Sequence, residues 1–164
     1  MATTYNDDAY FAGTVKFAGP TAFPANAIGD AQVNPSAPIT APKLEHRFMP
    51  RLAQPFGVAA AAERRVVHRA RAAGTVTAFW GGLTVANIGA ATVTIDLFKN
   101  GVTVLAAPVV LTSATPAFGS VTGALGGTVA YAAGDVLEVN VTAAAGGGTL
   151  GQGAFGEPVL TEGS

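Results

Sequence analysis

The chain contains no cysteine, and only two of its 164 residues are histidines. Without cysteine it can form neither a disulfide scaffold nor a thiolate metal site, and it has no cysteine nucleophile; the redox compartment stays open. His46 and His68 lie 22 residues apart with no acidic cluster beside them. The sequence therefore predicts no metal site.

A secretory leader and long apolar runs are also missing. The first ten residues, MATTYNDDAY, have no positively charged region and no apolar stretch of the kind that a signal peptide carries. Gly, Thr and Pro interrupt every apolar run before it reaches the roughly 18 residues that a membrane-spanning helix needs. The composition, 49% apolar and 12% charged, is nevertheless too hydrophobic for a disordered chain. We expect a soluble protein with a packed core and no membrane partner.

The net charge of −1 hides an uneven distribution of charge. Between Lys43 and Arg71 seven basic residues face two acidic ones, a local balance of +5, and the rest of the chain carries −6. This stretch, the basic belt, suggests an electrostatic docking surface, although a solvated connector is the alternative. It lacks the interleaved aromatic residues and the recognition helix of a nucleic-acid reader, which argues against nucleic acid as a partner. Its basic members are Lys43, Arg47, Arg51, Arg64, Arg65, Arg69 and Arg71.

Proline and glycine divide the chain into two parts. Seven of the ten prolines fall at or before Pro55, and 17 of the 21 glycines fall at or after Gly74. We predict an extended, proline-rich arm over residues 1–60 and a β-domain over 61–164. The arm is expected to hold one short strand over 11–17 and about two helical turns over 42–49, after Pro42.

Apolar residues are spaced along this arm without a local fold to bury them. Because prolines preorganise an extended chain, the arm is suited to lie on another protein or on sister subunits. The candidates for such contacts are its apolar residues and the neighbouring basic ones: Phe11, Phe17, Phe23, Ile28, Val33, Ile39, Leu44, Phe48, Lys43, Arg47, Arg51, Arg64 and Arg65.

The second part alternates apolar and polar residues with turn signals about every ten residues. In TVTIDLF, for example, Val93, Ile95 and Leu97 share one face, and Asn100-Gly101 then predicts a tight hairpin. The pair Gly81-Gly82 is expected to bend or bulge its strand. About eight short strands predict an all-β fold, an antiparallel β-sandwich of the jelly-roll type or a related one. The strands are expected around RRVVHRAR, GTVTAFW, LTVAN, TVTIDLF, VTVL with APVVLT, AFGSVTG, TVAY, VLEVNVTA and TLGQGAFGEPVL.

Candidate chemistry is sparse. The glycines of GQGAFG match G-x-G-x-x-G, but the chain ends eight residues later, without the helix that a dinucleotide site requires. Asp96, Glu138 and Glu157 fall at strand positions that the pattern points to solvent, and no serine elbow appears. We therefore predict no enzyme, no catalytic residue and no cofactor. Trp80 and Tyr131 could form a sugar-stacking platform, although a single tryptophan belongs more often to a core.

Several segments resemble a family of tailed-bacteriophage virion proteins, the head fibre, decoration or cement proteins. In the β-domain these are ATVTIDLFKNGVTVL, AAGDVLEVNVTA and GGGTLGQGAFGEPVL, and in the arm IGDAQVNPSAPITAPKLEHRF. The resemblance covers residues 11–160. It implies a non-enzymatic, often trimeric protein on the outer surface of the virion, bound to the major capsid protein. Unlike a long adhesive fibre, this chain ends directly after the β-domain, which favours a compact capsid binder.

Three hypotheses follow. The first is a capsid decoration or cement protein whose arm and basic belt bind the shell. The second is a tail or head fibre component that joins adhesive parts to the virion. The third is a surface carbohydrate-binding module for host glycans, with Trp80, Tyr131 and the loop around Gly146 to Gly148 as its site.

Overall fold

The computed structural model describes residues 46–162; residues 1–45 and 163–164 lie outside the described part. From here on the name β-domain stands for residues 46–162, which include residues 46–60 of the predicted arm. Within the β-domain all regular structure is β-strand, so the predicted all-β class is confirmed. The strands are β1 His46–Phe48, β2 Leu52–Ala53, β3 Glu63–Arg69, β4 Gly74–Val85, β5 Thr92–Lys99, β6 Val102–Thr103, β7 Val109–Leu111, β8 Ser120–Thr122, β9 Val129–Tyr131, β10 Val136–Ala144 and β11 Gln152–Glu162.

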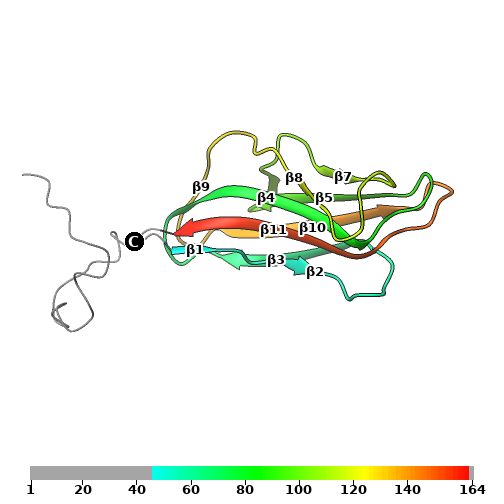
Figure 1. Cartoon of the computed structure of the whole chain (residues 1–164). Coiled ribbons are helices and arrows are strands. Elements are labelled where there is room, and N and C mark those ends of the chain that lie inside the picture. Colours follow the sequence, from blue (N-terminus) through cyan, green and yellow to red (C-terminus); the bar gives the residue numbers. More distant parts are fainter. Residues whose placement is uncertain (1–45, 163–164) are drawn as a thin grey trace, which may run out of the picture. The chain divides into compact units, whose positions relative to one another are not determined.

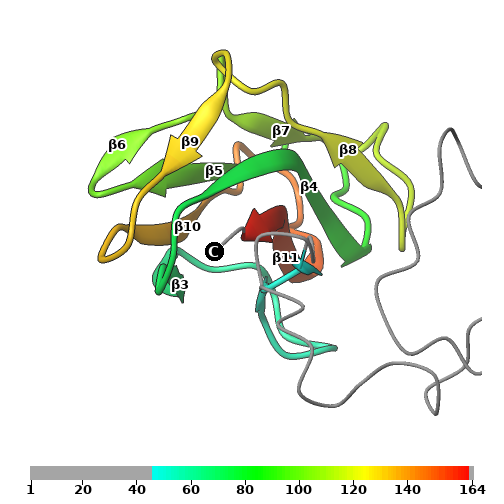
Figure 2. The ribbon, with the colours of Figure 1, turned by 90° about the vertical axis from the view of Figure 1, so that its left-hand side faces the viewer.

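The strands form two antiparallel sheets (Figure 1). Sheet A has the order β1-β11-β4-β8, with β2 also paired to β11 and β9 also paired to β4. Sheet B has the order β3-β10-β5-β6, with β7 also paired to β5. Figure 2 views the β-domain from the end at which β11 ends, with the labels of β3 and β10 to the left of those of β11 and β4.

The two sheets face each other across one hydrophobic core. The predicted alternation is confirmed in β5 and β10, where Val93, Ile95 and Leu97 and their neighbours Leu137, Val139 and Val141 are fully buried. Sheet A contributes Phe79, Leu83 and Leu160 to the same core. Close approach of the sheets depends on glycine, because a Cβ at Gly156 would lie only 2.6 Å from Cγ1 of Val139.

The expected helix over residues 42–49 is wrong where the structure describes it. His46, Arg47 and Phe48 form β1 and pair with Glu162, Thr161 and Leu160 of β11. A helix of two turns has little stability of its own, so pairing with an exposed sheet edge determines the conformation instead. Residues 42–45 of that prediction, and the strand expected over 11–17, lie outside the described residues.

Of the bend or bulge expected at Gly81-Gly82, the bulge is wrong. β4 passes through both glycines in regular register with β11, and the irregularity lies where Val159 and Leu160 pair with Ala78 and Val76 and leave Thr77 as the extra residue. Both positions need glycine because of packing rather than a bulge. A Cβ at Gly81 would meet Ile95 in the core, and a Cβ at Gly82 would meet the ring of Phe155.

The hairpin predicted at Asn100-Gly101 is confirmed. Both residues have positive φ, 50° and 84°, as a two-residue turn of the primed type requires. The hairpin folds β6 back along the end of β5, so that Phe98 pairs with Thr103.

The same hairpin covers Asp96, so the predicted exposure of its side chain is wrong. Asp96, expected in solvent, is 8% exposed, and its carboxylate accepts hydrogen bonds from the Thr103 hydroxyl and the Leu97 N–H, each at 2.8 Å.

Candidate functional site

One end of the β-domain gathers the point where the described chain begins and the point where it ends. Glu162 of β11 pairs with His46 of β1 on one side and with Gly74 of β4 on the other. The connection from β3 to β4, residues 70–73, therefore lies at the same level. We call this region, residues 46–48, 69–74 and 162, the arm end; in Figure 1 it is the left-hand end of the β-domain, where β11 ends.

A cluster around His68 joins the two sheets at the arm end. Nε2 of His68, in sheet B, lies 2.9 Å from Oε1 of Glu162 in sheet A. The His68 ring is 5.0 Å from the ring of Phe48 and 5.8 Å, edge to face, from that of Tyr131. Phe48 is half-buried against the core of its own domain. Residues 46–48, which the sequence assigned to the arm, therefore pack as part of the β-domain.

Tyr131 is buried within this cluster. Its side chain is 4% exposed, and its hydroxyl donates a hydrogen bond to the carbonyl of Thr161 at 3.1 Å. Burial, with a contribution from the negative charge of Glu162, raises the pKa of Tyr131 to about 12. The phenol is thus a neutral structural group that links β9 to β11.

The structure divides the basic belt into paired and unpaired arginines. Arg64 donates two hydrogen bonds to the carboxylate of Glu138, at 2.8 and 3.2 Å, and lies 4.5 Å from the ring centre of Phe98. Arg65 pairs with Glu63. Two positive charges of the belt are thus balanced by carboxylates of sheet B. The partner of Arg64 lies 74 residues away in the sequence. Glu138 was expected in solvent; it is half-buried in this ion pair.

The other described arginines of the belt are exposed and form no ion pair within residues 46–162. Arg47, Arg69 and Arg71 belong to the arm end, whereas Arg51 lies farther along sheet A, before β2. The remaining predicted contact residues lie outside the described part: Phe11, Phe17, Phe23, Ile28, Val33, Ile39, Lys43 and Leu44.

The residues proposed as a sugar platform do not come together. Tyr131 is buried at the arm end, while Gly146 packs against the carbonyl of Ala90 at the opposite end of the strands. Trp80 lies between them on β4, half-buried and opposite Glu157 of β11. This grouping from the sequence is therefore wrong, because the strand register separates its three members.

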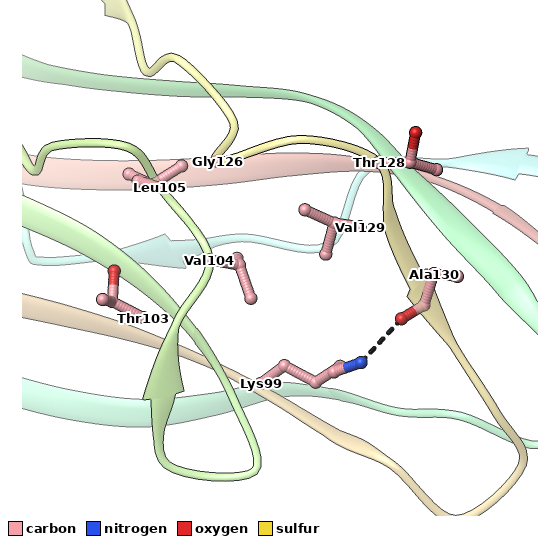
Figure 3. Close-up of a pocket in the computed structure, with 8 residues that line it drawn as sticks. All are labelled: Lys99, Thr103, Val104, Leu105, Gly126, Thr128, Val129 and Ala130. Carbon is pink, nitrogen blue, oxygen red and sulfur yellow. Dashed lines mark hydrogen bonds between the residues drawn. The ribbon is translucent and has the colours of Figure 1, made fainter.

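A cavity of about 380 Å³ opens between the two sheets near β6 and β9 (Figure 3). Lys99 of sheet B extends across it and donates a hydrogen bond to the carbonyl of Ala130 in sheet A, at 2.7 Å. Thr103, also in its wall, uses its hydroxyl to bind Asp96. The polar side chains here hold neighbouring strands together, and the cavity wall offers no pair of groups suited to acid–base or nucleophilic chemistry.

A second hollow, on the outer face of sheet A, was missed by the sequence reasoning. It measures about 260 Å³ and is lined by Arg51, Ala53, Gln54, Phe56, Thr84, Gly153, Phe155 and Glu157. We call it the β11 groove. Phe56 in its wall and Phe118 beside it are 71% and 73% exposed, and they are the largest of the exposed apolar side chains in the β-domain. The sequence did hold one signal for an exposed aromatic residue, the phenylalanine of the turn Pro55-Phe56-Gly57, because turns lie at the surface.

Comparison with known proteins adds no family assignment. No protein-family model matches the chain, and no curated protein matches it significantly. Among residues 46–162 the structure has no helix long and apolar enough to cross a membrane.

Proposed function

We propose that this chain is a non-enzymatic structural protein of a tailed-phage virion, which binds the outer surface of the capsid as a homotrimer and stabilises or decorates it. The partner is the major capsid protein. The N-terminal arm and the arginines of the arm end make the contacts with the shell, and the β-domain, a sandwich related to jelly rolls, projects outward. The sequence resemblance to head decoration and cement proteins supports this function.

The observation that carries the proposal is the composition of the arm end. Exposed arginines without an acidic partner in the β-domain, Arg47, Arg69 and Arg71, lie at the end where the chain passes from the N-terminal 45 residues into β1. The exposed positive charge and the junction with the arm therefore lie on one surface, which we expect to face the partner. Long-range attraction from such a patch accelerates association, and apolar contacts of the arm then hold the complex.

The energetics fit repeated weak contacts. An apolar side chain that becomes fully buried contributes about 1.5 to 3 kcal/mol, so a few anchors from one arm give modest affinity. Three arms on one trimer raise the effective concentration of each arm after the first has bound. The trimer would therefore hold the symmetric shell far more strongly than a single chain.

Purified capsids that lack this protein provide the test. We expect the full chain to bind them as a trimer, and a chain without residues 1–45 to bind at least about tenfold more weakly in a sedimentation assay. Circular dichroism should show that the shortened chain keeps its β-structure. Equal binding by both forms would exclude residues 1–45 as the docking element.

A matched pair of double variants tests the arm end. Arg47→Gln with Arg71→Gln should weaken capsid binding at low salt, with the difference shrinking as salt screens the charges. Arg51→Gln with Arg64→Gln removes the same charge from other surfaces and should leave binding close to that of the unmodified chain. If the two pairs weaken binding equally, net charge rather than the arm end controls the interaction.

A further inference from the structure

The floor of the β11 groove includes an aromatic ring that packs over a glycine. The ring of Phe155 in β11 covers Gly82 of β4, where a Cβ would come within 2.3 Å of the ring atom Cζ. Beside it Gly153 has a φ of 58°, and a Cβ there would lie 2.2 Å from the Thr84 hydroxyl oxygen. Glycine at these two positions is thus required for the hollow to have its present depth.

Two exposed aromatic rings stand at its rim. Phe56, in the β2–β3 connection, lines the groove, and its ring lies 6.4 Å from that of Phe118 with an angle of 19° between the ring planes. Phe118 adopts a φ of 57°, a conformation that a bulky side chain takes only under strain, while its N–H donates a hydrogen bond to Leu83. Strained backbone that presents an exposed ring is more typical of a binding surface than of a connecting loop.

The polar part of the groove holds one charge of each sign. Arg51 and Glu157 both line it, and neither forms an ion pair with another residue of the β-domain. The amide of Gln54, in contrast, is already bonded to Ala61 and Glu63. The groove thus offers a donor, an acceptor and an apolar floor, and its lining has no net charge.

This combination selects a class of ligand. A nucleic acid or an acidic glycan would place negative charge against Glu157, and an acyl chain would remove both charges from water without a partner. A neutral saccharide satisfies all three features, because it has apolar C–H faces for the rings and hydroxyls that both donate and accept.

We propose that the β11 groove binds one ring of a neutral saccharide, with a C–H face of the sugar against Phe155 and Phe56 and its hydroxyls bonded to Glu157 and Arg51. Its volume is close to the lower limit of about 300 Å³ for small-molecule sites. The groove is open, so the sugar ring can be part of a longer chain. Trp80 of β4 pairs with Glu157 of β11, and its half-buried indole extends the aromatic surface beyond the groove, where a longer saccharide could continue.

This site does not depend on the proposed attachment to a capsid, and of the sugar platform expected from the sequence it shares only Trp80, which borders the groove. Its failure would leave the capsid proposal standing, and loss of capsid binding would leave the groove intact. The two proposals are therefore tested by separate variants.

The experiment uses the full chain on an array of immobilised glycans that includes neutral hexose and N-acetylhexosamine oligosaccharides beside sialylated and uronic acid ones. We expect binding to neutral glycans. The strongest neutral binder is then titrated in solution by calorimetry against Phe56→Ala and Glu157→Gln, each of which should weaken binding by about tenfold or more. Val102→Ala is the matched control, because Val102 is 68% exposed on β6 of the other sheet, and it should bind as the unmodified chain does.

Other outcomes overturn the proposal. They are the absence of any neutral glycan above background, a preference for acidic glycans, or equal affinity in Phe56→Ala and the unmodified chain. Self-association of the chain through the exposed rings of Phe56 and Phe118 would also overturn it. If sedimentation velocity shows an assembly that Phe56→Ala dissociates, and no glycan competes with it, the rim is a contact between copies of this chain rather than a saccharide site.

Discussion

Replacing Asn87 with alanine should destabilise the β-domain more than any change of similar size on its surface. The side chain is 2% exposed, and it links three segments: Nδ2 donates to the carbonyl of Leu111 at 2.9 Å, and Oδ1 accepts from the N–H of Gly151 at 2.7 Å. Leu111 belongs to β7 in sheet B, whereas Gly151 leads into β11 of sheet A. Alanine would leave the buried N–H of Gly151 without this partner, and it would remove one donor from the carbonyl of Leu111, which also pairs with Val93 in sheet B.

The magnitude follows from the two hydrogen bonds that are lost. The unsatisfied N–H of Gly151 costs about 1 to 3 kcal/mol and the lost bond to Leu111 about 1 kcal/mol, which gives roughly 2 to 4 kcal/mol together, and the lower half applies if water enters the space. A domain of this size has a total stability of about 5 to 15 kcal/mol. Urea unfolding followed by the fluorescence of Trp80, the only tryptophan, measures the change. A loss below about 0.5 kcal/mol would refute the account, since surface substitutions typically fall within that range.

Asn87→Asp separates the hydrogen bonds from the packing. Aspartate keeps the acceptor for Gly151 but turns a carboxylate oxygen toward the carbonyl of Leu111, and burial should raise its pKa above the ordinary value of about 3.9. Because the folded pKa is the higher one, the penalty is largest at neutral pH and shrinks as pH falls through the folded pKa, where the protonated carboxyl can donate to Leu111. The difference in unfolding free energy from the unmodified chain, measured at each pH, should therefore narrow in acid. A constant difference would contradict the assigned bonds.

Further predictions concern packing and titration. Gly156→Ala should lower stability by about 1 to 3 kcal/mol through overpacking against Val139, whereas Gly126→Ala, whose Cβ would have no neighbour nearer than 3.4 Å, should change it little in a urea titration. The N–H of Ala132, the Asn100 amide and the charge of Lys99 hold the pKa of Asp135 below its usual value. This stability is present above pH 4 or so and lost as pH falls through the lowered pKa, so Asp135→Asn should flatten the acid limb of the stability curve. The absorbance change of Tyr131, obtained by difference from Tyr131→Phe, should occur near its pKa of about 12, and stability should fall as pH rises from about 10 towards that value.

The strands could be predicted because their signals are local and agree with their surroundings. Val93, Ile95 and Leu97 alternate with polar residues and face the core as expected, and Asn100-Gly101 closes the hairpin that follows them. In both cases the backbone conformation favoured by the sequence is also the one that buries the apolar side chains. Local and tertiary preferences then give the same answer.

The errors arose where distant segments decide the outcome. The apolar spacing of Leu44 and Phe48 suggested a helix, but β11, more than 110 residues later in the chain, offers an edge to which residues 46–48 pair. Asp96 looked solvent-exposed because alternation assigns a face but does not reveal that Thr103 will cover it. The β11 groove could not be foreseen for the same reason, since Arg51, Phe56 and Phe155 meet only through the pairing of β2 with β11.

The positions of the arm end and the β11 groove have a consequence for a capsid-bound protein. Along β11 the two are marked by Glu162 and Phe155, seven residues apart, which corresponds to about 23 Å of strand. Contacts at the arm end therefore leave the groove accessible, and we expect capsids carrying the full chain to bind the same neutral glycan that the free protein binds. Immobilised glycan should retain such capsids but not capsids carrying Phe56→Ala, which should still dock normally. Capsids that lose glycan binding although the free protein keeps it would mean that the shell covers this face of sheet A, and that the domain lies on its side rather than projecting from the arm end.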